Sequence, residues 1–112
     1  MQYSDEFIIN LCVNRICALF KVKQADVCRE MIIGVDIVSE KGVWPEEVAY
    51  DELSFDVELF ASRKELKMME GNEYKILTLG DYCDFMLRHY KEDSNGNAVV
   101  SFLQESLRKF DG

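Results

Sequence analysis

Few side chains of the kind that carry out catalysis occur in this 112-residue chain. It contains one histidine, His89, and four cysteines, Cys12, Cys17, Cys28 and Cys83. A cysteine nucleophile needs a neighbouring base, and the one such couple within a segment is Cys83 with His89. A separation of six residues on a helix places two side chains about 240° apart around the axis, on different faces. We therefore expect no catalysis by this couple and predict that the protein is not an enzyme.

The cysteines also give no sign of a metal site. They lack C-x-x-C spacing, and three of them lie in predicted helices close to apolar faces. This arrangement is typical of free, buried thiols in a reducing compartment. A zinc site needs Cys or His ligands paired two to four residues apart, and His89 stands alone. We expect no metal and no other cofactor.

The charge balance of the chain is acidic. Asp and Glu number 21 against 13 Lys and Arg, which gives a net charge of −8. The resulting field repels phosphate backbones, which are bound by clustered Lys and Arg, so we do not expect direct binding to nucleic acid. The field suits a protein partner with a basic surface, or a mimic of nucleic acid that occupies a basic groove. Solubility alone would also explain it.

Aromatic and acidic residues gather in the central third of the chain. The aromatic ones are Trp44, Tyr50, Phe55 and Phe60. We expect them mainly to seal the core of a small domain. An exposed Trp44 would be the first candidate for contact with a partner, and the acids that follow it would steer a basic surface toward it. The candidate partner-binding residues are Trp44, Glu46, Glu47, Asp51 and Glu52.

Length and hydropathy indicate one folded domain over residues 1–112. Hydrophobic residues make up 48% of the chain, which is too much for a disordered segment. A single core of this size still removes roughly two-thirds of the unfolded surface from water. The sequence has no signal-peptide pattern and no run near the ~20 apolar residues that span a bilayer. We expect a cytoplasmic protein that does not enter membranes.

Two helices are predicted most clearly. Ser4 or Asp5 can cap the first, and Thr78 with Asp81 has the spacing of a capping box for the second. Both carry apolar residues at intervals of three and four, the pattern of one buried stripe. The first stripe is Ile8, Leu11, Cys12, Ile16, Leu19 and Phe20, and the second is Leu79, Tyr82, Cys83, Met86 and Tyr90. We expect Ile16 and Leu19 to pack against Tyr82 and Met86.

The middle of the chain allows two interpretations. Residues 53–59 alternate apolar and polar side chains, which is the period of a half-buried strand. Residues 32–38 are rich in β-branched side chains and favour a loop or short strand. Pro45 followed by two acids is a fair helix start, and Ser62 with Glu65 has capping-box spacing for a helix over 63–70. A last helix is expected over 97–112, and 25–31 can form a short helical turn.

Several segments resemble acyl carrier proteins. Phe20 to Val27 resembles the end of that family's first helix, with Lys21 at its usual glycine, and Tyr74 to Leu87 resembles its closing helix. Between them, Asp51 to Asp56 and Val57 to Leu59 resemble the family's acidic approach and its Val-Glu-Leu. The resemblance covers about residues 7–89, so that 1–92 would form a carrier-like body and 97–112 an additional C-terminal helix. It implies a small bundle of four or five helices; a compact α+β domain with a short sheet around 32–38 and 48–59 is the alternative.

The chain departs from the family at the residue that carries its chemistry. The four residues expected between Asp56 and Val57 are missing, including the serine to which phosphopantetheine is attached. Such a linkage requires a hydroxyl at an exposed helix start beside acidic residues. Ser54 is the nearest candidate, followed by Ser39. We therefore expect a non-catalytic acidic binding domain, with a functional acyl or peptidyl carrier modified at Ser54, and an acidic inhibitor or nucleic-acid mimic, as the alternatives.

Overall fold

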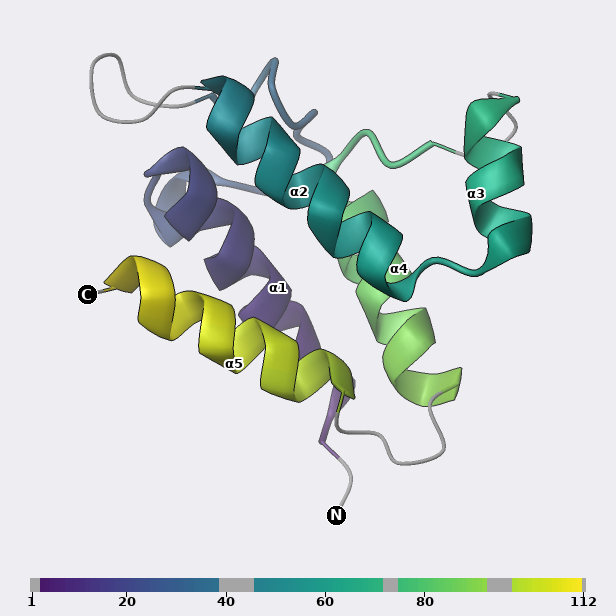
Figure 1. Cartoon of the computed structure of the whole chain (residues 1–112). Coiled ribbons are helices and arrows are strands. Elements are labelled where there is room, and N and C mark those ends of the chain that lie inside the picture. The colour runs from purple at the N-terminus through teal and green to yellow at the C-terminus, as the bar shows by residue number, and fades with distance from the viewer. Residues whose placement is uncertain (1–2, 39–45, 72–74, 93–97, 112) are drawn as a thin grey trace.

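The protein is mainly helical. The computed structural model describes residues 3–38, 46–71, 75–92 and 98–111, except the side chains of 46–50 and 109–111. In these residues it has five α-helices and one turn of 3₁₀ helix, and residues paired by β-type hydrogen bonds form only isolated bridges (Figure 1). The α-helices are α1 (Asp5–Phe20), α2 (Glu46–Phe60), α3 (Arg63–Glu70), α4 (Leu79–Glu92) and α5 (Ala98–Asp111), and the 3₁₀ turn is Gln24–Asp26. The predicted helical bundle is confirmed.

The α+β alternative is wrong. Residues 48–59, which would have supplied a strand, lie within α2, and residues 32–38 make two isolated bridges instead of a strand. The alternation of apolar residues was misleading because two of them point outward. Leu53 is buried and Val57 half-buried, at a spacing of four, whereas Phe55 and Leu59 are exposed. The inward positions follow the period of a helix.

Polar side chains define where three of the helices begin. The Ser4 hydroxyl accepts a hydrogen bond from the Phe7 amide at 3.1 Å at the start of α1. Ser62 and Glu65 form a complete capping box at the start of α3. Thr78 and Asp81 do the same for α4, with both bonds at 3.0 Å. The local rules for helix starts were therefore sufficient at these three sites.

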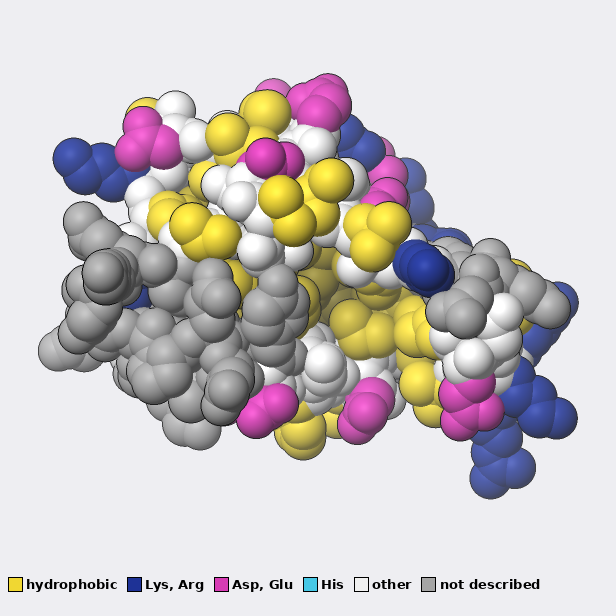
Figure 2. Space-filling model, turned by 90° about the horizontal axis from the view of Figure 1, so that it is seen from above, with side chains coloured by type: hydrophobic (Ala, Val, Ile, Leu, Met, Phe, Trp, Pro, Cys, Tyr) yellow, Lys and Arg dark blue, Asp and Glu magenta, His cyan; other side chains and the backbone are white. Residues whose placement is uncertain are grey.

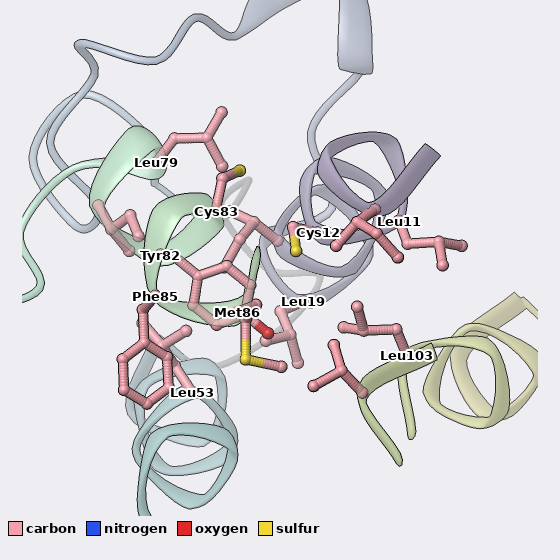
Figure 3. Close-up of a cluster of buried hydrophobic side chains, with 14 of the residues drawn as sticks. Leu11, Cys12, Leu19, Leu53, Leu79, Tyr82, Cys83, Phe85, Met86 and Leu103 are labelled. Atoms are coloured by element: carbon pink, nitrogen blue, oxygen red, sulfur yellow. The ribbon is translucent and has the colours of Figure 1, made fainter. Parts of the chain in front are cut away.

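The core lies where α1 packs along both α4 and α5 (Figures 1 and 3). Ile16, Leu19, Tyr82 and Met86 are all fully buried, as the two apolar stripes predict. Figure 3 shows Leu19 beside Met86 and the ring of Tyr82. The last helix belongs to the same core: its buried side chains include Val99, Val100 and Leu103.

The segment between α1 and α2 is tied to the start of α4 by backbone hydrogen bonds. The Ile33 amide donates to the Leu77 carbonyl at 2.8 Å, and the Gly80 amide donates to the Arg29 carbonyl at 2.9 Å. The Arg29 guanidinium lies so close to Gly80 that a side-chain carbon there would approach it to 3.0 Å. The predicted helical turn over 25–31 is shorter than expected, since only Gln24–Asp26 is helical.

In the parts of the chain that the structure describes, no helix is both long and apolar enough to cross a membrane.

Candidate binding face on α2

The helix α2 is the most acidic element of the protein. Its 15 residues include six Asp or Glu and no Lys, Arg or His. Every other α-helix contains at least one basic residue. The excess negative charge of the chain is therefore concentrated on one helix.

Two large apolar side chains are exposed on α2. Phe55 is 56% exposed and Leu59 is 51% exposed, and their spacing of four places them one turn apart on the same side of the helix. Asp51, Ser54 and Glu58 are also exposed. Figure 2, which looks down on the side of the molecule where α2 lies, shows exposed hydrophobic side chains with separate acidic ones among them. The outer side of α2 thus combines apolar area with negative charge.

The inner side of α2 is held by a buried ion pair. Arg15 of α1 is 2% exposed and Asp56 of α2 is 0% exposed. The guanidinium binds the carboxylate with two bonds, from Nε to Oδ2 at 2.9 Å and from Nη2 to Oδ1 at 2.8 Å. Tyr82 of α4 donates its hydroxyl to Asp56 Oδ2 at 2.7 Å. Three helices therefore meet at one carboxylate.

The surroundings of Arg15 keep its guanidinium charged. Burial alone would lower the pKa of Arg15, but its hydrogen bonds and attraction to Asp56 raise the pKa above the usual value. Burial, followed by the charge of Asp56, raises the pKa of Tyr82 well above 10. The tyrosine hydroxyl thus stays protonated as a donor to Asp56. Charge-assisted, bidentate bonds of this type are the stronger kind of protein hydrogen bond.

The ion pair extends toward solvent at one edge. Arg15 Nη2 also lies 3.3 Å from Glu52 Oε2, and the Glu52 side chain is 41% exposed. The guanidinium carbon lies 5.7 Å from the centre of the Phe102 ring of α5. The Phe60 ring of α2 meets the same ring edge-on, with centres 5.4 Å apart. Glu52 thus couples the buried network to the acidic outer side of α2.

The structure separates the predicted partner-binding residues into three groups. Trp44 lies outside the described residues. Glu46 and Glu47 open α2, as the sequence predicts, but their side chains are outside the described part. Asp51 is exposed on α2, and Glu52 is partly engaged with Arg15. The acids of the prediction thus lie on a single helix.

The central aromatic residues were expected to lie mainly in the core. This expectation is wrong for Phe55 and holds in part for Phe60. Phe55 faces solvent, whereas Phe60 is half-buried against Phe102. The side chain of Tyr50 lies outside the described residues. Sequence reasoning did not find Phe55 as a surface residue because it left residues 53–59 open between strand and helix and expected the central aromatic residues to lie mainly in the core.

Ser54 is exposed but does not open a helix. It is the ninth of the 15 residues of α2, six residues before the helix ends. The modification that the carrier resemblance implies requires a hydroxyl at a helix start. Ser39, the second candidate, lies outside the described residues. The position of Ser54 therefore meets one of the two geometric requirements, exposure, and not the other.

The network of Arg15, Asp56 and Tyr82 was not predicted. A signal for it exists in the sequence, because Arg15 falls between Leu11, Cys12 and Leu19 in the apolar stripe of α1. A charged residue at a core position requires a buried partner. Asp56, at the corresponding inward position of α2, is that partner.

The histidine and the cysteines occupy different surroundings. His89 Nε2 lies 3.0 Å from Glu65 Oε1 of α3. Cys83, on the same helix, is buried in the core with Cys12. Among the described residues, no group of three or more His, Cys, Asp or Glu side chains is placed to hold a metal ion.

Comparisons of the chain with protein-family models, with curated proteins and with solved structures gave no match.

Proposed function

We propose that the protein is a non-catalytic binding domain that engages a protein partner through the outer side of α2. The observation that carries the proposal is the pairing of Phe55 and Leu59, both about half exposed, on a helix that has six acids and no base. The partner surface that fits this face has apolar residues surrounded by Lys or Arg. In the carrier-like version of this proposal, the domain would have lost its prosthetic arm and kept an acidic recognition helix.

Each part of the face has a physical role in binding. Fully burying a Phe or Leu side chain contributes about 1.5–3 kcal/mol, so Phe55 and Leu59 supply the affinity. Asp51 and Glu58, exposed at the rim, speed the encounter with a basic surface and make it sensitive to salt. Apolar anchors within a charged rim are the usual layout of a specific protein interface.

The buried ion pair contributes by fixing the helix before binding. Arg15, Asp56 and Tyr82 tie α2 to α1 and α4. A helix that is already in place loses less conformational entropy when a partner docks on it. The face on α2 is therefore pre-organised.

A titration with a defined probe tests the proposal. The probe is an amphipathic helical peptide of Lys and Leu, added to ¹⁵N-labelled protein at two salt concentrations. We expect amide shifts centred on α2 that weaken at high salt. The double variant Phe55→Ser/Leu59→Ser should bind the peptide at least about tenfold more weakly, the loss expected from about 1.4 kcal/mol.

Two matched controls localise the effect. Val35 and Leu77 are also exposed apolar residues but lie outside α2, and changing both to Ser should leave binding unchanged. Asp26 and Glu30 are exposed acids outside α2, and their change to Lys should weaken binding less than the same change at Asp51 and Glu58. Equal losses in the test and control variants would refute a site on α2.

The two alternative functions give different results. Incubation with a phosphopantetheinyl transferase and coenzyme A should leave the mass unchanged; a gain of one phosphopantetheine that disappears in Ser54→Ala would favour a carrier. Binding of a nucleic-acid-binding protein that depends on Asp51 and Glu58 but not on Phe55 and Leu59 would favour a nucleic-acid mimic. Both results would contradict the proposed apolar anchor.

A further inference from the structure

The surface charge changes sign where α2 is followed by α3. Arg63, Lys64 and Lys67, near the start of α3, all have exposed side chains. Among the described residues, none of the three takes part in an ion pair. Figure 1 shows α3 beyond the C-terminal end of α2, and Figure 2 shows Lys and Arg side chains at the right-hand edge, where α3 lies in Figure 1. The apolar pair Phe55 and Leu59 thus lies between an acidic and a basic end.

These groups are spaced symmetrically about Val57. Phe55 and Leu59 lie two residues on either side of it, and Asp51 and Arg63 lie six residues on either side. Six residues of helix span about 9 Å, and Arg63 lies three residues beyond the last residue of α2. When two copies pack with their α2 helices antiparallel, Phe55 of one copy meets Leu59 of the other. At each end of this contact, Asp51 of one copy meets Arg63 of the other, so the face is complementary to itself.

We propose, building on the proposed function, that the partner of the α2 face is a second copy of this chain, with its own α2 antiparallel across a two-fold axis near Val57. An interface of this symmetry uses the same surface on both copies, so each contact between different residues occurs twice. The basic surface that the acids of α2 require is then supplied by the start of α3 in the other copy.

The structure holds the start of α3 in place and leaves its bases at the surface. Ser62 and Glu65 form the capping box of the first turn. The Glu65 carboxylate also binds Arg88 and His89 of α4. Glu65 is the one acid in the first turn of α3, and α4 engages it. The exposed charge at this end of α3 is therefore basic.

Apolar burial supplies the affinity of such a dimer, and charge determines its direction. Antiparallel packing removes two copies of Phe55 and Leu59 from water at once, whereas parallel packing would place Asp51 beside Asp51 of the other copy. Interfaces below about 1,200 Å² are typical of weak complexes, and a pair of helices forms a small interface. The net charge of −8 opposes association further. We therefore expect a dimer in equilibrium with monomer at micromolar to millimolar concentrations.

Glu58 gives the dimer a property that binding to a basic partner does not share. It is exposed on the same side of α2 as Phe55. Because it lies one residue from Val57, the Glu58 side chains of the two copies lie near each other across the two-fold axis, and like charges repel. Glu58→Gln should tighten self-association about twofold, the effect of removing one like-charge pair. The same change should weaken binding of the Lys-Leu peptide, which every acid of the face attracts.

Sedimentation equilibrium of the full chain at concentrations up to about 1 mM tests the proposal. We expect a monomer–dimer equilibrium for the wild-type protein. Phe55→Ser/Leu59→Ser should dimerise at least about tenfold more weakly. The control Val35→Ser/Leu77→Ser, which changes exposed apolar residues outside α2, should dimerise as the wild type does. A wild-type protein that stays monomeric over this range, or equal losses in the two variants, would overturn the proposal.

Paired charge reversals test the contact between the two ends. Asp51→Lys should dimerise at least about tenfold more weakly than wild type, and so should Arg63→Glu/Lys64→Glu, because each variant places like charges at both ends of the interface. An equimolar mixture of the two variants should associate as tightly as the wild type. In the mixed dimer, the new lysine of one chain faces the new glutamates of the other, and the second end keeps its native pair. A mixture that associates no more tightly than its components would overturn the assigned pairing.

The same measurements separate the second copy from the binding face itself. A protein that stays monomeric but binds the Lys-Leu peptide through Phe55 and Leu59 would refute the second copy as the partner, and the face on α2 would stand. Glu58→Gln that weakened both self-association and peptide binding would refute the two-fold axis near Val57. Loss of self-association and of peptide binding in the wild-type protein would refute the face as well.

Discussion

The contact of α1 with α4 and the contact of α1 with α2 are built in different ways. Against α4, the helix α1 buries a continuous apolar surface that includes Ile16, Leu19 and Met86. Against α2, it places a charged guanidinium on a buried carboxylate. Apolar contacts tolerate small shifts of one helix past another, whereas a bidentate ion pair fixes position and direction. The difference indicates that α4 stabilises the fold and that the ion pair determines where α2 lies.

The residues that stabilise the fold differ from those proposed to bind a partner. The apolar contact uses every large residue of the two predicted stripes for the core. The α2 side leaves Phe55 and Leu59 in water although α2 is well positioned. An apolar surface that is exposed on a rigid helix is available to a partner. The proposed binding face therefore depends on the polar anchor as well as on the burial of Leu53 of α2 in the core.

The first prediction concerns the anchor and has the largest expected effect. Asp56→Ala leaves the buried charge of Arg15 without its carboxylate, and such a change typically costs about 3–5 kcal/mol of folding free energy. Chemical denaturation of the variant measures it. The double variant Arg15→Met/Asp56→Leu should recover most of this loss, because an apolar pair of similar size avoids buried charge.

Binding distinguishes the two roles of the anchor. If the ion pair positions α2, Arg15→Met/Asp56→Leu should fold stably and still bind the Lys-Leu peptide more weakly than wild type does. If this double variant regained both the stability and the peptide affinity of the wild type, apolar packing would position α2 as well as the ion pair does. That result would remove the distinction between the two contacts.

The second prediction concerns the apolar contact. Leu19 is fully buried between α1 and α4, and its change to Ala should cost about 2–5 kcal/mol, as large-to-small core substitutions do. Glu92→Ala, at an exposed position near the end of α4, should change stability by no more than about 0.5 kcal/mol. Equal, small losses in both variants would show that the face of α1 has been misassigned.

The core could be predicted from the sequence because it obeys one simple rule. Apolar residues at spacings of three and four mark the buried faces of α1 and α4, and capping boxes at Ser62 and Thr78 mark two helix starts. Each of these signals is local, so one segment is enough to recognise it. The capping bonds and the buried stripes are present in the structure.

The candidate site could be predicted only in part. The acids of α2 are visible in the sequence, but the exposure of Phe55 depends on whether residues 53–59 form a helix or a strand. The partners Arg15 and Asp56 are 41 residues apart, and a contact at that distance is not encoded by any local period. Both the exposure of Phe55 and the pairing of Arg15 with Asp56 depend on the tertiary structure. The one sign of the buried pair in the sequence is the charge of Arg15 within an apolar stripe.

The third prediction uses pH to probe the anchor. Tyr82 has a pKa raised by burial and by the charge of Asp56. A raised pKa in the folded state stabilises the protein fully at pH values below about 10, the pKa of an unperturbed tyrosine, and this stabilisation is lost as pH rises through the folded-state value. Alkaline denaturation should therefore begin near pH 10 in the wild-type protein. In Tyr82→Phe the dependence on pH should be weaker there.

The same variant should lose about 1.5–3 kcal/mol at neutral pH, the range for a hydrogen bond whose partner is charged. Fluorescence-detected unfolding at pH 7 and at pH 10.5 measures both effects. An unchanged alkaline slope in Tyr82→Phe would show that ionisation of Tyr82 does not drive alkaline denaturation, and an unchanged stability at pH 7 would show that its hydroxyl bond to Asp56 contributes nothing to the anchor.

The smallest expected effect lies at the start of α4, where neither contact is involved. Asp81 Oδ2 accepts hydrogen bonds from the amides of Leu77 and Thr78, both at 3.0 Å. Burial opposes ionisation, but these bonds lower the pKa of Asp81 below its usual value. A lowered pKa stabilises the folded state above about pH 3.9, and the contribution is lost as pH falls through the folded-state value. Asp81→Asn should cost about 0.3–1 kcal/mol at pH 7, the range for a charge at a helix N-terminus, and less at pH 3.

Salt distinguishes this exposed charge from the buried pair. Because the Asp81 side chain is partly exposed, 1 M salt should reduce the loss in Asp81→Asn at pH 7. The loss in Asp56→Ala should persist in salt, since the buried pair is shielded from ions. Thermal unfolding at both pH values, with and without salt, measures these differences. If salt weakened both variants' losses equally, Asp56 would be accessible to ions, and α2 would have to be mobile on α1 rather than fixed by a buried charge.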